Sequence, residues 1–198
     1  MKKHIFKILL MILMSLGGLA IASGGIFIYS LITSFAESTK PIEDVSQYRE
    51  IWESLDTYSQ QQVKHFPSKI PSNAKNLRLY YTPGHLQGGT VFQMRMQLPA
   101  DDIKTLQSQF RKIAKRKYIP GSQNNSPKSE TIPSGENISF NYNLYAGESE
   151  TKEFPPNYEI LVLEDTRGAP KYDWNHSNLY GVAIKVSNHE IVYWMEDW

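Results

Sequence analysis

The chain has 198 residues, carries 21 basic and 20 acidic side chains, and contains no cysteine. The absence of cysteine excludes disulfide bonds, thiol catalysis, thiolate zinc sites and iron–sulfur clusters. The near balance of charge creates no strong positive field, so nucleic acid is not expected as a partner. The residues after position 36 suffice for one domain with its own hydrophobic core.

The first feature along the chain is an apolar run at residues 8–36, which holds no charged side chain. A bilayer core needs about 20 apolar helical residues, so this run is long enough to span it. Lysines precede the run within residues 1–7, and acidic residues follow it in the polar segment 37–44. The positive-inside rule then predicts a single-pass protein of the cell membrane, with its N-terminus in the cytoplasm and its C-terminal domain outside.

A cleaved signal peptide is the alternative interpretation of this segment. Residues 8–19 fit a hydrophobic region, and Ala20-Ile21-Ala22 fits a cleavage site, which would make the protein secreted. The apolar run continues to residue 32, however, so cleavage would leave an exposed apolar end. A retained anchor in the lipid bilayer is therefore favoured, with residues 37–44 as a spacer and 45–198 as the extracytoplasmic domain.

Two amphipathic helices are predicted in this domain. In residues 45–66 apolar side chains recur near helical spacing, and Pro67 ends the pattern. Residues 100–118 give the clearer helix, with Asp101 and Asp102 near its positive N-terminal end. Its apolar stripe consists of Ile103, Leu106, Phe110, Ile113 and Ala114.

Alternation of polar and apolar residues predicts the strands. Before the C-terminal hairpin, strands are expected at residues 77–81, 90–98, 138–146 and 158–163. The polar stretch 122–136 between them is predicted to be a mobile loop.

The last two strands form a predicted hairpin with Asn188-His189 as a two-residue turn, because Asn tolerates the left-handed backbone of such turns. This turn puts Trp194 on the face opposite the core, either packed under a helix or exposed to a partner. The fold is therefore expected to be α+β: an antiparallel sheet of about six strands with one or two helices packed on it, preceded by a single N-terminal transmembrane helix. The expected pairs of the hairpin, all on one face, are Val186–Ile191, Ile184–Tyr193 and Val182–Met195.

Two loops carry residue types that bind ligands. The glycine-rich connection 83–89 joins two strands and does not enter a helix, so it is a candidate ligand or partner loop and not a phosphate loop. Segment 173–178 resembles the opening of a calcium loop, but Asn178 and Ile184 stand where an EF-hand needs Gly and Glu. The candidate residues are Gly84, His85, Gln87, Gly88, Gly89, Asp173, Asn175 and His176.

No catalytic motif is complete, so no catalytic residue, metal ligand or cofactor is assigned from the sequence. The five histidines lack metal-ligand spacing, and neither H-E-x-x-H nor G-x-S-x-G occurs. An acid/base pair that the fold assembles from distant residues stays open. Its candidates are Glu164, Asp165, Asp173, His85 and His176.

A basic cluster occupies the end of the second predicted helix. It suits anionic lipid headgroups or an acidic partner, although cations are also favourable at any helix C-terminus and the solvated face is the preferred interpretation. The cluster consists of Arg111, Lys112, Lys115, Arg116 and Lys117.

The anchor and the lack of an intact catalytic motif favour a non-enzymatic function. We expect a membrane-anchored extracytoplasmic module that binds or assists another envelope component, with an envelope protein as the partner. Two alternatives stay open: an envelope hydrolase that uses the acid/base candidates, and a small-ligand or ion sensor that uses the two loops.

Overall fold

A computed structural model describes Tyr29 and residues 40–84, 89–118, 128–131, 137–140, 142–147, 153–167 and 177–197. The chain divides into two compact units, residues 1–40 and 41–198, and the fold described here is that of the second. Apart from Tyr29, the predicted membrane span lies outside the described residues. Among the helices that are described, none is both long and apolar enough to cross a bilayer.

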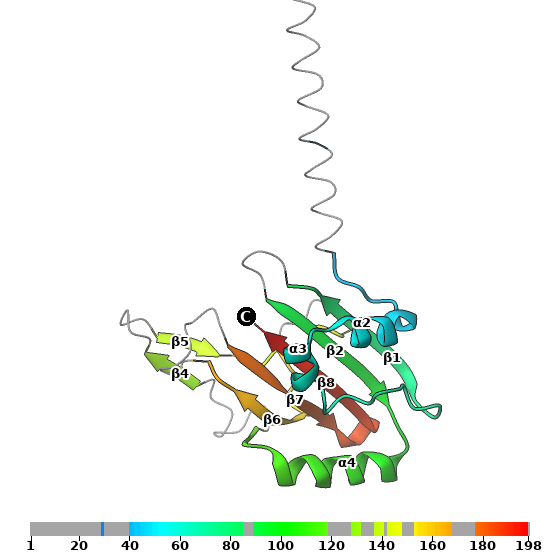
Figure 1. Cartoon of the computed structure of the whole chain (residues 1–198). Helices are drawn as coiled ribbons and strands as arrows, with labels where there is room; N and C mark the ends of the chain where they lie inside the picture. The colour runs from blue at the N-terminus through cyan, green and yellow to red at the C-terminus, as the bar shows by residue number, and fades with distance from the viewer. Residues whose placement is uncertain are drawn as a thin grey trace, which may run out of the picture. The chain divides into compact units, whose positions relative to one another are not determined.

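The second unit is built on a six-stranded antiparallel sheet, which confirms the predicted α+β class (Figure 1). The strand order is β1-β2-β8-β7-β6-β3, and β4 and β5 form a separate two-stranded sheet. The elements in chain order are η1 (Val45–Gln47), α2 (Tyr48–Ser54), α3 (Thr57–Gln62), β1 (Lys75–Thr82), β2 (Thr90–Gln97), α4 (Ala100–Ile113), β3 (Arg116–Tyr118), β4 (Lys128–Thr131), β5 (Asn137–Phe140), β6 (Glu159–Asp165), β7 (Asn178–Lys185), η3 (Val186–Asn188) and β8 (Glu190–Asp197).

The helices close one face of the sheet, which holds the larger core. Strand alternation turns Phe92, Met94 and Met96 of β2 towards this side, and all three are fully buried. Ile51 of α2 and Ile103 of α4 belong to the same apolar cluster, so helices from before and after the β1–β2 hairpin share one core.

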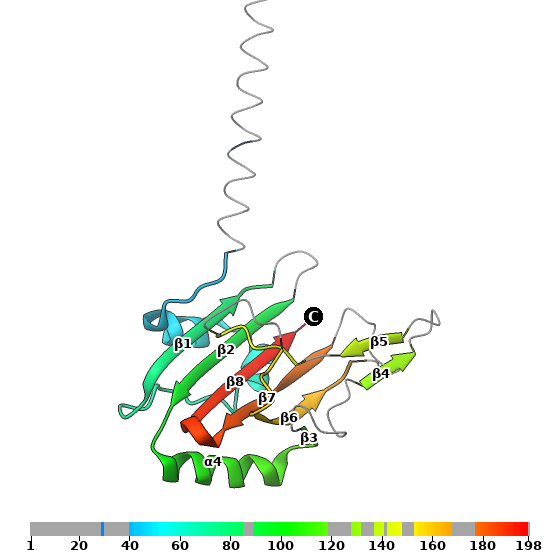
Figure 2. The same cartoon turned by 180° about the vertical axis from the view of Figure 1, so that it is seen from behind.

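The opposite face holds a second core beneath two segments without regular structure, residues 142–147 and 153–158 (Figure 2). Trp194 is only 1% exposed there, and its ring centroid lies 5.8 Å from that of Tyr142. Gly181 leaves room for the indole, because a β-carbon at this position would lie 2.8 Å from it. Trp194 is therefore a core residue of the second face, covered by coil and not by a helix.

The first predicted helix is broken into several pieces. Residues 45–66 fold as η1, α2 and α3, with Leu55 in an extended conformation between the two α-helices. Asp56 starts α3, because its carboxylate accepts hydrogen bonds from the amides of Tyr58 and Ser59 at 2.8 Å. An aspartate in the N-cap position favours a new helix over continuation of the old one.

The second predicted helix ends at Ile113, earlier than expected. Arg116–Tyr118 form β3 and pair with β6 instead, so they supply the sixth strand of the sheet. The predicted strand 138–146 is confirmed only in its first part: β5 covers Asn137–Phe140 and pairs with β4, whereas residues 142–146 are not a strand. β4 itself lies within the stretch 122–136 that was expected to be a loop.

The C-terminal hairpin is confirmed, but its predicted register is wrong by two residues. Ile184 pairs with Ile191, and Val182 pairs with Tyr193. The connection is longer than two residues, because η3 precedes His189, whose φ of 52° is left-handed. A shift by two preserves the side of each strand residue, so the predicted core face is still correct.

Candidate functional site

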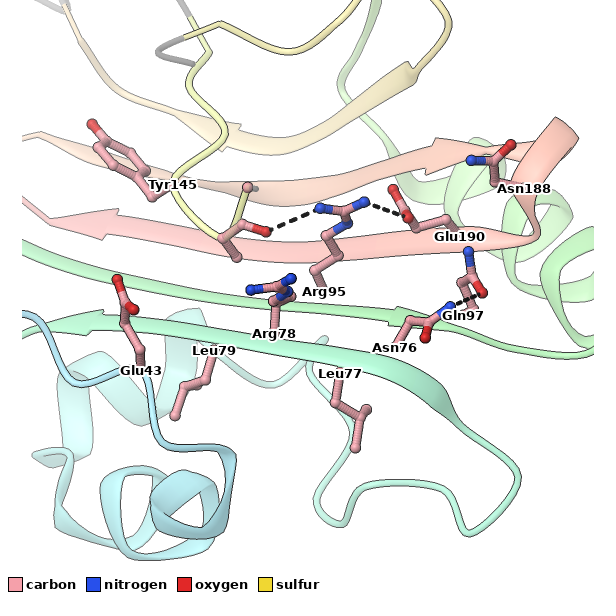
Figure 3. A pocket seen from close by; sticks show the side chains of 12 residues that line it. Glu43, Asn76, Leu77, Arg78, Leu79, Arg95, Gln97, Tyr145, Asn188 and Glu190 are labelled. Carbon is pink, nitrogen blue, oxygen red and sulfur yellow. Dashed lines mark hydrogen bonds and ion pairs between the residues drawn. The ribbon is translucent and has the colours of Figure 1, made fainter. Parts of the chain in front are cut away.

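A polar cleft of about 510 Å³ lies on the side of β1 and β2 that faces away from the helices (Figure 3). Strand alternation builds it: Leu77 and Leu79 point to the helix side, whereas Arg78 points into the cleft. The polar side chains that line it come from distant parts of the chain and are Glu43, Asn76, Arg78, Arg95, Gln97, Tyr145, Asn188 and Glu190.

Two arginines lie directly opposite each other in this cleft, since Arg78 of β1 pairs with Arg95 of β2. Arg95 donates to the buried carboxylate of Glu190 at 2.9 Å and to the carbonyl oxygen of Ala146 at 3.4 Å. Glu190, whose side chain is 1% exposed, also accepts a short hydrogen bond from Tyr158. Arg78 is exposed and forms no ion pair with any residue in the described part of the chain.

One wall of the cleft is the segment 142–147, which Gln93 holds against the sheet. The fully buried Gln93 amide donates to the carbonyl of Asn143 at 2.7 Å. Its oxygen accepts from the backbone amides of Tyr145 and Ala146 at 2.8 and 3.1 Å. A side chain thus replaces the ladder that a neighbouring strand would provide, and it fixes the backbone beside the arginines.

The outer end of the cleft is shaped by a β-bulge in β1. The register with β2 shifts between Lys75 and Arg78, and Asn76 adopts a left-handed backbone with a φ of 50°. Its side-chain amide donates to Gln97 at 2.6 Å across the strands. Bulges of this kind often re-aim a side chain next to a functional site.

Glu43 reaches the cleft because the preceding residue is bound to the edge of the sheet. Ile42 and Tyr81 exchange two backbone hydrogen bonds, of 2.7 and 2.9 Å. The Glu43 side chain is exposed, and no ion pair joins it to Arg78 in Figure 3. The cleft therefore contains a carboxylate and a guanidinium that do not neutralise each other.

A second hollow, an apolar groove of about 830 Å³, lies on the helix side between α4 and the turn after α3. His65 lines it and donates through Nε2 to the carbonyls of Gly181 and Trp194, at 2.9 and 3.2 Å. Burial lowers the pKa of His65 to about 4, although these carbonyls partly offset the effect. A neutral imidazole therefore fastens the turn after α3 to β7 and β8.

The two loops predicted to bind ligands lie largely outside the described residues. His85, Gln87 and Gly88 fall in one gap, and Asp173, Asn175 and His176 fall in another. Gly84 is described, and its amide donates to the hydroxyl of Thr90 at 3.0 Å. Gly89 lies directly before β2, so these two glycines are the members of the two sets that fall within the described residues.

The basic cluster is divided between the end of α4, the link after it and β3, and carboxylates neutralise most of it. Within the described ranges, Lys112 and Lys117 have no ion-pair partner, and both are exposed. The ion pairs of the other three residues are Arg111–Glu159 at 2.8 Å, Lys115–Glu164, and Arg116–Asp165 at 3.5 Å.

The described acid/base candidates are both engaged in ion pairs. Asp165 contacts Arg167 at 3.0 Å and accepts a hydrogen bond from Tyr142. Burial alone would raise the pKa of Asp165, but the hydrogen bonds and charge of Arg167 outweigh it and lower this pKa. Such a carboxylate stays ionised and is a poor proton donor. In the described parts of the chain, no three side chains are grouped as a metal site would need.

The cleft was missed at the level of sequence because its residues form no motif. Arg78 and Arg95 could have been found by pairing the two predicted strands and noting like charges on the polar face. Glu190 and Glu43 carry no such signal, since tertiary contacts bring them there. Comparisons with protein-family models, curated proteins and solved structures give no match to the chain.

Proposed function

We propose that the chain is a membrane-anchored extracytoplasmic binding module that holds an anionic group of another envelope component in the polar cleft. The observation that carries this proposal is the Arg78–Arg95 pair. Like charges directly opposite each other on neighbouring strands destabilise a sheet, by a few tenths to about 1 kcal/mol. A pair of like charges that destabilises the sheet is explained if a ligand binds to it.

The two arginines have different roles in this proposal. Arg95 already donates hydrogen bonds to Glu190 and Ala146, and it therefore acts as a structural part of the cleft floor. Arg78 presents a planar fork of donors, which suits a carboxylate or phosphate. Bound beside Arg78, an anion would give this guanidinium the counter-charge that Glu190 already gives Arg95. The neighbouring amides of Asn76 and Gln97 offer further hydrogen bonds.

The membrane part of the proposal rests on the sequence. The uncharged run 8–36 is long enough to span a bilayer, and the lysines before it favour a cytoplasmic N-terminus. The segment 37–44 would then link the membrane span to the domain that holds the cleft.

The test is a pull-down of the full-length protein, solubilised in mild detergent, followed by mass spectrometry of everything that co-purifies. We expect one reproducible partner that carries an anionic group, that is lost with Arg78→Gln and that is kept with Lys112→Gln. The second variant makes the same charge change on α4, outside the cleft, and so also tests the basic cluster. Capture that survives Arg78→Gln, or capture of no partner, would refute the proposal.

A further inference from the structure

Two opposite charges face the polar cleft without pairing with each other. Glu43 and Arg78 both line it, and Figure 3 shows no ion pair between them. In the described part of the chain, neither side chain has another ion-pair partner, whereas Arg95 and Glu190 in the same cleft bind each other at 2.9 Å. The cleft thus contains one satisfied pair of charges and one separated pair.

The separation of Glu43 from Arg78 is built into the backbone. The double hydrogen bond between Ile42 and Tyr81 fixes the position of Glu43 at the sheet edge. Pairing with Arg95 fixes Arg78 within β1. Each residue therefore presents its charge from a different, ordered support. A ligand that bridged them would meet a cation from β1 and an anion from the sheet edge, which gives orientation as well as affinity.

We propose that the ligand of this cleft is a zwitterion, whose carboxylate binds Arg78 and whose ammonium group binds Glu43. This inference rests on the proposed function and names the chemical class of its ligand: an amino acid, or a short peptide with free ends. A purely anionic ligand would meet repulsion from Glu43, because like charges in a binding site disfavour the wrong partner.

The test measures binding to the full-length chain in detergent by isothermal titration calorimetry. The probes are three pools of dipeptides with uncharged side chains: free dipeptides, N-acetylated dipeptides that keep only the carboxylate, and C-amidated dipeptides that keep only the ammonium. A pool of free amino acids distinguishes a single residue from a peptide as the source of the zwitterion. We expect the free dipeptides or amino acids to bind at least about tenfold more tightly than either blocked pool, as loss of one charge-assisted hydrogen bond predicts.

Variants assign the two ends of the ligand. Glu43→Gln should abolish the preference for free over N-acetylated dipeptides and leave binding of the N-acetylated pool unchanged or stronger. Arg78→Gln should weaken both pools. Glu50→Gln, which removes an exposed carboxylate on α2 outside the cleft, should change neither.

Two results would overturn the zwitterion and leave the proposed function intact: equal binding of free and N-acetylated pools that still depends on Arg78, or no binding of any pool while the pull-down still depends on Arg78. Binding of free dipeptides that is insensitive to both Glu43→Gln and Arg78→Gln would also overturn it. If the pull-down were equally insensitive to Arg78→Gln, the proposed function would fail as well.

Discussion

Phe92 and Met94 of β2 lie in an apolar core beneath the helices, whereas Gln93 and Arg95 of the same strand face a polar cleft and the coil that walls it. The helix side gains free energy from apolar burial, at about 25 cal/mol per Å². The opposite face also holds an apolar core, but its cleft places two guanidinium groups opposite each other. In the cleft Arg95 and Glu190 form an ion pair, whereas Arg78 and Glu43 are exposed and have no ion-pair partner among the described residues.

This contrast teaches where to look for function in a chain without a motif. Both sides come from one alternating strand, so the alternation alone does not distinguish a solvated face from a binding face. The distinction comes from the arrangement of charge. Gln93 and the Arg95–Glu190 pair build a fixed polar frame, and Arg78 is left to face the open space beside it.

Among the variants that compare the two sides, Glu190→Gln should lower the free energy of unfolding most. The change leaves Arg95, whose side chain is 16% exposed, without its carboxylate, and we expect the free energy of unfolding to fall by about 3 kcal/mol. Urea unfolding of the full chain, followed by tryptophan fluorescence, measures it. Glu53→Gln breaks the exposed Arg49–Glu53 pair and should change little. Equal effects of the two variants would show that the cleft pair is not a structural element.

The stability of the helix side should depend on pH, because His65 titrates there. Its pKa is about 4 in the folded chain and about 6.5 in the unfolded one, so the unfolded state binds more protons between these values. Stability is then fully present above pH 6.5 and is lost as pH falls towards 4, by about 3 kcal/mol. Unfolding curves across this range should show the loss in the wild type and a smaller loss in His65→Gln. Parallel pH profiles for both proteins would contradict this assignment.

A smaller effect is expected for Gln93→Leu, which keeps the side chain near its size but removes three hydrogen bonds to the segment 142–147. We expect a loss of about 2 kcal/mol, because a carbonyl and two amides lose their partners. Amide hydrogen exchange should accelerate at Tyr145 and Ala146 and stay slow at Val182 in β7. Unchanged protection at Tyr145 would mean that Gln93 does not hold the wall.

Local patterns were sufficient for the strands β1, β2, β6, β7 and β8, because each alternates or is continuously apolar, and for the start of α4. They failed where a helix cap or a tertiary pairing decided the structure. Asp56 started a new helix inside the predicted first one, and residues 116–118 joined β6 although the helical pattern ran on. Tertiary pairing with an exposed sheet edge overrode helix propensity there.

The candidate site was less predictable than the fold. The cleft needs the bulge at Asn76, the bridge between Ile42 and Tyr81, and the clamp of Gln93, and none of these contacts is local in sequence. The sequence predicted ligand sites in two loops instead, because their glycine and histidine content can be recognised without a structure. The informative signal was the position of a charge relative to its cross-strand neighbour.

The free energy of unfolding of Arg78→Gln, measured without ligand, tests most directly whether the cleft side is kept for recognition. Because the substitution removes a like charge opposite Arg95, we predict that stability stays the same or rises by a few tenths of a kcal/mol. A fall of more than about 1 kcal/mol would contradict the account, since ordinary surface substitutions stay within about 0.5 kcal/mol and Arg78 would then be a structural residue.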